Sequence, residues 1–508
     1  GYSDFKGGRY LMIMQAISMI FNPFCLLLIL IGVIIGIIFG AIPGLSATMA
    51  LVLFLPMSFG MDPMNGIALL VGLYLGGISG GLISVILLKI PGTPSSIATV
   101  FDGGPMADRG EAGKALGVAI LCSFIGGLLS IFALMFISPY LAKITLMFTS
   151  AEYFAIAVFS LTIIASLSGD SLINGVLSGL LGITLALVGL APIDGARRFT
   201  FGQSQLYGGF DTVVILIGVF AVADIIISGF NRKDIVSDAE KMPYNLKGFG
   251  ISAKELMSHW YNILRSSLIG LGIGILPGIG GSTASLLAYT AAKNGSKYPE
   301  KFGTGILDGV IASETSNNAV IGGSLIPLIT MGIPGNVATA IFLGGLTIHG
   351  ISPGPLIFQK SGQYVYGIFI ALIVANIFMI ICERAGLRIF VKLLDIPKYI
   401  LLPIVMVCCV LGAYFANFNI FDVWCVVIFG MVGLLFKTLK IPSTPLIIGF
   451  ILGSMTEENL RQALMQSGGN WSIFVTRPIS LVFLIVAVLS IVLPIIKKNK
   501  LKKAKSSL

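Results

Sequence analysis

The sequence predicts an all-α polytopic membrane protein. Of its 508 residues, 56% are hydrophobic and only 11% are charged, whereas an average soluble domain has roughly 25% charged residues. The mean hydropathy is +0.99, and apolar runs recur from residue 24 to residue 494. At about 20 residues for each crossing, these runs supply about a dozen transmembrane helices. So few charges cannot cover a soluble surface, which excludes a soluble enzyme, a nucleic-acid-binding protein and a disordered chain.

The apolar runs and the content of glycine, proline and cysteine indicate which kind of membrane protein this is. Residues 26–39 and 481–496 are continuous apolar runs, whereas the strands of a transmembrane β-barrel would alternate. The 63 glycines and 22 prolines allow close helix packing and break helices, and a broken helix must be buried or line a cavity. These breakers favour a transporter or a channel over a simple anchor. The 6 cysteines lack metal-site or disulfide spacing, so we expect buried free thiols.

The charged residues divide the chain into five segments. We expect an N-terminal segment over 1–23, whose first residues are typical of an expression scar or a trimmed start. A first membrane repeat follows over 24–228, then a basic connecting loop over 229–260. A second membrane repeat with additional C-terminal helices covers 261–495, and a basic tail covers 496–508. Because basic loops stay in the cytoplasm, the net charge of +10 predicts a cytoplasmic loop and tail and no nucleic-acid partner. Anionic membrane lipid is the alternative partner of the tail.

Two helix breaks in the first half of the chain recur in the second half. Residues 40–44 read Gly-Ala-Ile-Pro-Gly, and residues 274–278 read Gly-Ile-Leu-Pro-Gly. Downstream, an Ile-Pro-Gly break followed by Ala-Thr occurs at residues 90–99 and again at residues 333–339. Interrupted apolar segments at corresponding positions of two halves mark the binding site of many secondary transporters. We therefore expect two inverted repeats whose broken helices or helical hairpins meet at mid-membrane, with parallel repeats as the alternative.

Small neutral hydrogen-bonding residues follow each break. Proline stops the preceding helix and glycine permits the turn, so the next helix starts with unpaired amides and a positive dipole end. Such a terminus favours an anion, here a carboxylate. The expected substrate-binding residues are Pro43, Gly44, Ser46, Thr48, Gly92, Thr93, Ser95, Ser96, Gly278, Gly280, Gly281, Ser282, Thr283, Gly335, Asn336 and Thr339. Carbonyls freed near Pro43, Pro91, Pro277 and Pro334 are candidate ligands of Na⁺. The alternative is a set of packing kinks whose hydroxyls bond to their own helices.

A second polar group lies in an otherwise apolar stretch of the second half. On a helix, Glu314, Asn317 and Asn318 share one face. An acid and two amides in such surroundings need protein or aqueous partners. We expect Glu314 to carry or sense a coupling cation and the amides to coordinate substrate or Na⁺, with Asp308 as the next candidate acid. The alternative is a polar brace between helices.

The polar connection over 102–114 follows the second break. We expect a turn and a short amphipathic helix at the interface, with Asp102 capping that turn or, as the alternative, contacting ligand. Elsewhere the chain has no Gly-x-x-x-x-Gly-Lys-Ser/Thr loop and no dinucleotide fingerprint, and its two histidines, His259 and His349, are far apart. We therefore expect a protein that is not an enzyme and has no cofactor other than Na⁺ as a coupling ion.

Together these motifs resemble the large membrane subunit (TctA-type) of the tripartite tricarboxylate transporter family. The matching stretches are residues 40–44, 90–107, 113–117, 274–281, 308–319, 323–327 and 331–339. The resemblance implies a multi-pass subunit of a bacterial inner membrane that imports citrate-like tricarboxylates, dicarboxylates or related organic anions. It implies a small four-helix membrane subunit and an extracytoplasmic solute-binding protein as partners, and symport driven by a Na⁺ or H⁺ gradient.

Two other functions remain open at this point. One is a channel or a permease subunit of an ATP-driven importer, which would need a docking helix such as one within the central loop. The other is a membrane-embedded enzyme that uses Glu314 as an acid or base. Uptake driven by an imposed ion gradient without ATP would separate the transporter from the first of these.

Overall fold

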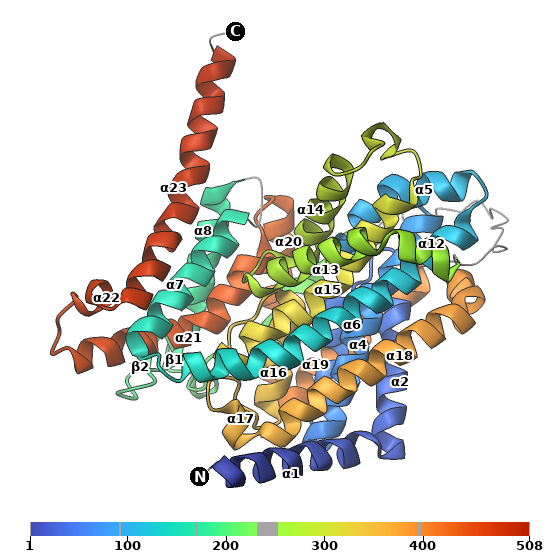
Figure 1. The fold of residues 1–508 in the computed structure, drawn as a ribbon. Helices are drawn as coiled ribbons and strands as arrows, with labels where there is room; N and C mark the ends of the chain where they lie inside the picture. Colours follow the sequence, from blue (N-terminus) through green and yellow to red (C-terminus); the bar gives the residue numbers. More distant parts are fainter. Residues whose placement is uncertain (1, 91–92, 168–170, 231–251, 394–397, 507–508) are drawn as a thin grey trace.

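The computed structural model describes residues 2–90, 93–167, 171–230, 252–393 and 398–506 (Figure 1). The elements over residues 2–230 are mostly helices. They are α1 (Tyr2–Ile20), α2 (Pro23–Ala41), α3 (Ala47–Ser58), α4 (Pro63–Leu87), η1 (Pro94–Thr99), α5 (Val100–Asp108), α6 (Ala112–Thr145), α7 (Ser150–Leu167), α8 (Leu172–Ala186), β1 (Gly189–Leu190), β2 (Arg197–Arg198), η2 (Ser204–Leu206), α9 (Thr212–Leu216), η3 (Ile217–Val222) and α10 (Ala223–Phe230).

The elements over residues 252–506 are again helical. They are α12 (Ala253–Ser258), α13 (Trp260–Ile275), α14 (Gly280–Asn294), η4 (Pro299–Lys301), α15 (Leu307–Met331), α16 (Val337–Ile348), α17 (Ile357–Lys360), α18 (Gly362–Leu393), α19 (Lys398–Asn417), α20 (Ile420–Thr438), α21 (Ser443–Gln466), α22 (Ile473–Thr476) and α23 (Pro478–Ser506). Within the described ranges the strands amount to one antiparallel pair, β1 with β2. The predicted all-α class is confirmed.

The apolar helices fall into two length classes. Six stretches of the described chain are long and apolar enough to cross a membrane, and seven shorter apolar helices accompany them. The α3 and α16 helices, which follow breaks, have 12 residues each and are therefore about 18 Å long. Each spans only part of a hydrocarbon core about 30 Å thick. The breaks thus produce partial crossings, as broken transmembrane helices require.

Helix contacts relate the two halves of the chain to each other. In the first half α2 and α3 pack on α4, and in the second half α13 and α14 pack on α15. Across the halves α14 packs on η1 and α16 on α3, while α15 packs on α6 and α4 on α18. In these pairs α15 corresponds to α4 and α6 corresponds to α18, as expected of two related repeats. The inversion of one repeat relative to the membrane stays a prediction.

Glycines bring the α2 and α4 helices into backbone contact. Gly32, Gly36 and Gly40 lie four residues apart on α2 and face α4, as the small-xxx-small spacing of membrane helices requires. A Cβ added at Gly36 would lie 2.6 Å from the Leu73 carbonyl oxygen. The packing therefore depends on the absence of side chains at these positions.

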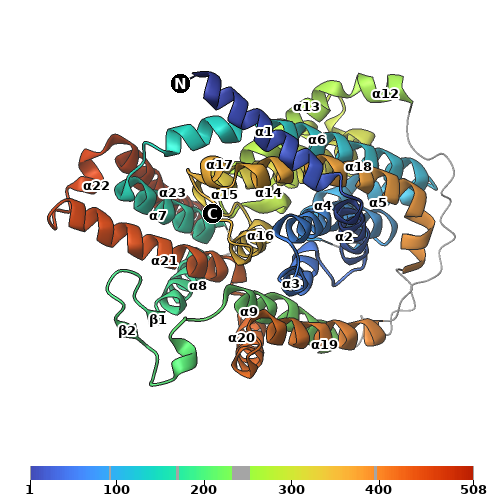
Figure 2. The same ribbon diagram turned by 90° about the horizontal axis from the view of Figure 1, so that it is seen from below.

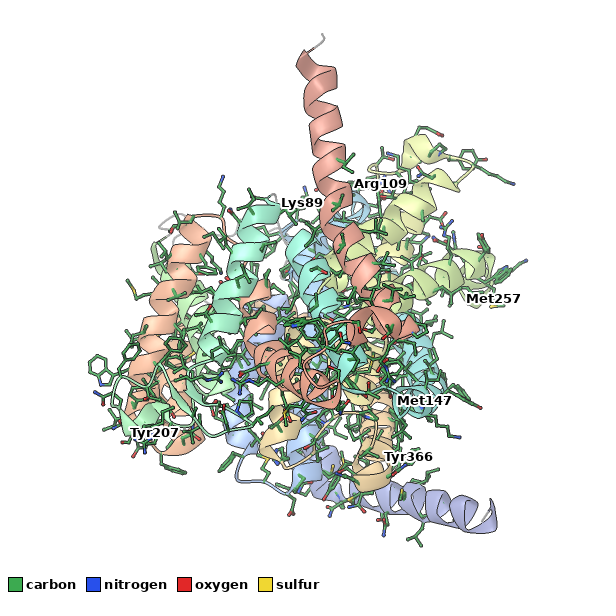
Figure 3. All side chains as sticks on the ribbon, turned by 90° about the vertical axis from the view of Figure 1, so that its left-hand side faces the viewer. Lys89, Arg109, Met147, Tyr207, Met257 and Tyr366 are labelled. Atoms are coloured by element: carbon green, nitrogen blue, oxygen red, sulfur yellow. The ribbon has the colours of Figure 1, made fainter. Side chains whose placement is uncertain are left out.

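A peripheral layer flanks the repeats. It contains α7, α8 and α21 in mutual contact, with α23 packed on α7. The α9–η3–α10 segment packs against α19 and α20. Figure 1 shows the end of α23 at the top, α12 at the right in the upper half, and α1 and α17 at the bottom. Figure 3 places Lys89 and Arg109 toward the upper end and Tyr207 and Tyr366 toward the lower end. Most of the predicted central loop lies outside the described residues, so its side of the membrane stays a prediction.

Candidate functional site

The first break supports the short α3 helix. Helix α2 ends at Ala41, Gly44 adopts a left-handed φ of +95°, and Ser46 starts the next helix. The Ser46 hydroxyl accepts a hydrogen bond from the Met49 amide at 3.1 Å. This side chain thus caps its own helix, and Thr48 in the first turn is half-buried.

The second break carries a cluster of buried hydroxyls. Pro91 and Gly92, predicted as part of the site, lie outside the described residues, which resume at Thr93. The Thr93 hydroxyl is 3.1 Å from the Ser95 hydroxyl and 2.8 Å from the Ser96 hydroxyl. All three side chains are buried. The sequence-predicted hydroxyls of this break therefore form one connected group.

The third break meets both the second and the fourth. The Gly278 amide donates to the Gly335 carbonyl at 2.6 Å, and the Ser285 hydroxyl donates to the Ser95 carbonyl at 2.9 Å. A Cβ added at Gly281 would lie 2.8 Å from the Ser95 Cβ. Helix α14 begins at Gly280 without a side-chain cap, and Ser282 and Thr283 in its first turn are half-buried. Helix α14 thus starts without a side-chain cap at the place where breaks from the two halves meet.

The fourth break is closed by a capping box. Asn336 accepts from the Thr339 amide at 2.9 Å, and the Thr339 hydroxyl accepts from the Asn336 amide at 2.9 Å. The Asn336 side chain also donates to the Tyr74 hydroxyl of α4 at 3.3 Å, and Tyr74 hydrogen-bonds Ser324 of α15 at 3.0 Å. The side chains of Ser46, Asn336 and Thr339 thus hold helix ends, and their role in substrate binding stays a prediction. At the junction of the second break with α14, the first amides of α14 have no side-chain cap.

Glu314 lies near this junction, and its carboxylate accepts hydrogen bonds from hydroxyl groups of the first half. Its carboxylate accepts from Thr99 of η1 at 2.5 Å and from Ser123 of α6 at 3.1 Å. Glu314, Asn317 and Asn318 lie on α15 and are buried, as the sequence predicts for one helix face. Asn318 donates to the Glu314 carbonyl at 3.2 Å. Residues from both halves thus assemble one intramembrane polar group, which we call the Glu314 cluster.

The amides of the Glu314 cluster retain unused hydrogen-bonding atoms. The Asn317 side chain and the Asn318 Oδ1 have no hydrogen-bond partner among the described residues. Asn317 lies close to the Glu314 carboxyl, but their contact lacks hydrogen-bond geometry. A Cβ at Gly281 would come within 3.0 Å of the Asn317 Oδ1. Asn317 therefore connects Glu314 with the start of α14.

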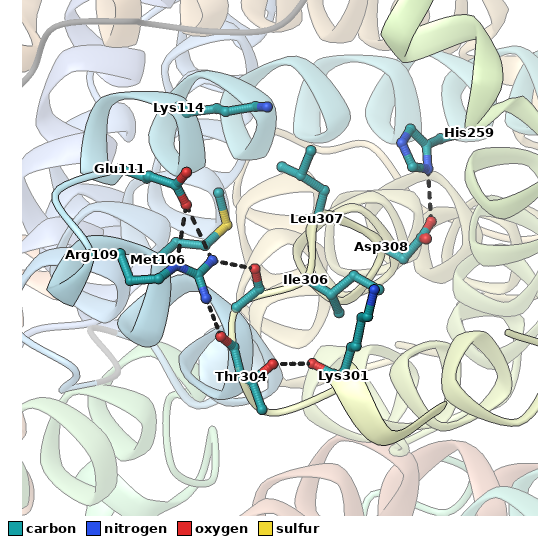
Figure 4. Close-up of a pocket in the computed structure, with 11 residues that line it drawn as sticks. Met106, Arg109, Glu111, Lys114, His259, Lys301, Thr304, Ile306, Leu307 and Asp308 are labelled. Atoms are coloured by element: carbon teal, nitrogen blue, oxygen red, sulfur yellow. Dashed lines mark hydrogen bonds and ion pairs between the residues drawn. The ribbon is translucent and has the colours of Figure 1, made fainter. Parts of the chain in front are cut away.

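Asp308 belongs to a different site. It accepts from the His259 Nδ1 at 2.8 Å and from Asn262 at 2.9 Å, and the hydrogen bond to Asp308 raises the pKa of His259. A cavity of about 460 Å³ adjoins this pair (Figure 4). It is lined by Met106, Arg109, Glu111, Lys114, His259, Lys301, Thr304, Gly305, Ile306, Leu307 and Asp308. Six residues of helix separate Asp308 from Glu314, about 9 Å along the axis, so the two predicted acids do not share a site.

Asp102 corrects a prediction. It does not cap its own turn, because it lies inside α5 and is fully buried. Its Oδ1 accepts from the amides of Gly303, Gly305 and Ile306, at 2.8–3.0 Å. Its Oδ2 accepts from the Tyr289 hydroxyl at 2.9 Å. The carboxylate therefore organises a loop of the other half, which local sequence could not reveal.

Sequence reasoning also missed polar groups that the fold brings into the interior. Tyr74 and Ser123 sit alone in apolar runs, and Glu383 stands next to Arg384, where it reads as part of a charged helix end. The structure buries all three. An isolated polar residue within an apolar run is the signal that could have singled out Tyr74 and Ser123.

The sequence matches the Tripartite tricarboxylate transporter TctA family over residues 26–448. The chain belongs to that family. It is 34% identical over 475 residues, 94% of each chain, to a protein of Agrobacterium vitis named "Uncharacterized 52.8 kDa protein in TAR-I ttuC' 3'region". A second protein of that organism, "Uncharacterized protein in TAR-II ttuC' 3'region", is 34% identical over 231 residues, 46% of this chain and 96% of its own length. No solved structure matches the chain.

Family membership confirms the resemblance seen in the motifs. It makes this TctA-family chain the membrane subunit of a tripartite tricarboxylate transporter, which is a transporter component. With its apolar helices, the chain is a multi-pass membrane protein. The roles of the site residues and the coupling ion stay predictions.

Proposed function

We propose that this subunit imports a carboxylate by secondary transport, driven by a Na⁺ or H⁺ gradient. An extracytoplasmic solute-binding protein delivers the substrate, and a small four-helix membrane subunit completes the transporter. The observation that carries the proposal is the junction of the second break with the uncapped start of α14, next to Glu314. Helix amides and hydroxyls there suit an anion. The partners follow from the family, whose transporters are tripartite.

The coupling cation belongs in the Glu314 cluster under this proposal. A carboxylate, the Thr99 and Ser123 hydroxyls and the unpartnered Asn317 and Asn318 oxygens form an oxygen-rich set, which fits a hard cation such as Na⁺. The set comes from both halves of the chain, so a bound cation would favour the arrangement in which they are together. We place the substrate on the α14 side, where Asn317 approaches Gly281.

The orientation follows from charge. We place the segment 229–260 and the basic tail on the cytoplasmic side of a bacterial inner membrane, because basic loops are retained there. The cavity beside Asp308 then lies toward the cytoplasm, since α12 and the end of α23 both lie in the upper half of the molecule as Figure 1 shows it.

The test is uptake by vesicles that contain the complete transporter. We expect a labelled carboxylate to accumulate under an imposed Na⁺ or proton gradient without ATP. A requirement for ATP would instead identify a permease subunit of an ATP-driven importer.

Two acid variants then test the site. Glu314→Gln should abolish accumulation while the protein amount stays similar, because the Thr99 and Ser123 hydroxyls can reorient toward an amide. Asp308→Asn is the matched control and should keep accumulation. Normal accumulation by Glu314→Gln together with loss in Asp308→Asn would move the coupling role to Asp308.

A further inference from the structure

A second carboxyl group is buried among the membrane-spanning helices. Glu383 lies on α18 and has no exposed surface, and neither of its carboxyl oxygens has a hydrogen-bond partner among the described residues. Glu152, which is also buried, has an ion pair with Arg477 at 2.5 Å. Glu314 has two hydroxyl donors. Glu383 is therefore the buried glutamate whose negative charge the described structure does not compensate.

The helices packed on α18 bring little charge to this position. They are α1, α2, α4, α6 and α17, and in Figure 2 α18 lies between α6 and the α2–α4 pair. Neither α2 nor α4 contains an Asp, Glu, Lys, Arg or His residue. Other titratable groups on these helices, within the described side chains, are Tyr10, Cys25, Tyr74, Lys114, Cys122, Tyr140, Lys143, Lys360, Tyr364, Tyr366 and Cys382. Arg384, Arg388 and Lys392 on α18 itself are exposed.

Two groups do reach Glu383. The Ser79 hydroxyl of α4 lies beside it, without hydrogen-bond geometry, and is itself fully buried and unpartnered. Helix α6 joins α18 to the helix of Glu314, because its Gly126 packs on Thr315 of α15 and its Gly127 on Asn376 of α18, and the Glu314 charge repels that of Glu383. Two turns earlier on α18, Asn376 donates to the Phe124 carbonyl at 2.9 Å and leaves its Oδ1 without a partner. The polar face of α18 thus borders the Glu314 cluster.

These surroundings indicate whether Glu383 binds a metal cation or a proton. An uncompensated carboxylate in a membrane interior is costly, and a buried intramembrane acid is usually part of an ion pathway. A metal cation needs several oxygen ligands, whereas among the described residues the hydroxyl that interacts with Glu383 is that of Ser79. A proton needs no further ligand, and the protonated carboxyl can donate to the Ser79 oxygen.

We propose that Glu383 is a proton-binding site of this transporter, coupled electrostatically to the Glu314 cluster. A proton from water on one side of the membrane binds the carboxylate oxygen, and the neutral acid later releases it to water. Two nearby carboxyl groups rarely ionise together, so a proton on Glu383 and a charged Glu314 favour each other. A cation in the Glu314 cluster removes the repulsion and assists proton release from Glu383. The role in transport rests on the proposed function, whereas proton binding by Glu383 does not.

The first experiment detects the proton directly. Infrared difference spectra of the purified full-length chain in lipid, recorded as the pH rises from neutral to alkaline, should show the carbonyl stretch of a protonated carboxyl group disappearing. The band should be missing from Glu383→Gln and present in Glu152→Gln, the control at an ion-paired buried glutamate. A band of wild-type intensity in Glu383→Gln would overturn the proposal, whatever the transport measurements show.

The second experiment asks whether that proton is used. In vesicles with the complete transporter and a fixed Na⁺ gradient, an imposed pH gradient should change wild-type carboxylate uptake. Glu383→Gln should lose this response but keep exchange of labelled for unlabelled carboxylate, which needs no net ion movement. Glu152→Gln should keep both. An unchanged pH response in Glu383→Gln overturns the coupling role. Absence of wild-type uptake would instead contradict the proposed function and leave the infrared result to decide proton binding.

Discussion

Removing the Asp102 carboxylate should destabilise the protein strongly, although the residue lies outside the Glu314 cluster. Asp102→Ala deletes the acceptor of three backbone amides, those of Gly303, Gly305 and Ile306, and of the Tyr289 hydroxyl. Hydrogen bonds to a charged group contribute about 1.5–3 kcal/mol each. Because neighbouring bonds are not additive, we expect a loss of about 4–6 kcal/mol in the free energy of unfolding.

Two milder variants separate the contributions of the Tyr289 hydroxyl and of the three amides to this loss of stability. Tyr289→Phe removes one of the four bonds and should cost about 1–2 kcal/mol. Asp102→Asn keeps a carbonyl oxygen for the three amides and places an amino group opposite the Tyr289 hydroxyl, which can accept from it. Its cost should lie between the other two.

Thermal melting of the purified variants in one detergent shows which variant loses most stability. We expect the melting temperature to fall least for Tyr289→Phe, more for Asp102→Asn and most for Asp102→Ala. The loop that Asp102 holds leads directly into α15, so uptake should fall in the same order. An Asp102→Ala protein with the melting temperature of the wild type would show that these amides find water or other partners, and would refute the reasoning.

Two further predictions concern the α14 junction and the Asp308 cavity. Gly281→Ala places a methyl 2.8 Å from the Ser95 Cβ and should lower uptake about tenfold or more at matched expression. The control is Gly272→Ala, whose methyl meets nothing within 4 Å, and which should keep uptake. Equal uptake by the two variants would show that transport does not use the junction. The hydrogen bond to Asp308 raises the pKa of His259 above its ordinary 6.5, so its stabilisation is complete below that value and is lost as the pH rises through the folded-state pKa. The melting temperature should therefore fall over that range in the wild type and more weakly in Asp308→Asn, and parallel curves would contradict the assignment.

The breaks were the most predictable part of the site. Proline and glycine act on the backbone locally, so the positions at which α2 and α13 end could be predicted from residues 40–44 and 274–278. The placement of Glu314, Asn317 and Asn318 on one helix follows from their spacing alone. What their side chains contact does not, because Thr99 and Ser123 are about 200 residues away along the chain.

The sequence by itself determined the membrane class, the helical architecture, the repeated breaks and the family. Each of these depends on composition or on short-range pattern, since lipid forces backbone groups to pair within helices. Tertiary structure alone decided which break residues cap helices, as Ser46 and Asn336 do, and which breaks pack on one another, as the second and third do. It also turned Asp102 from an expected local cap into a contact between the two halves, and it buried Glu383 beside Ser79. The physical reason is that a polar side chain in a membrane must find its partner within the protein, and that partner can lie anywhere along the chain.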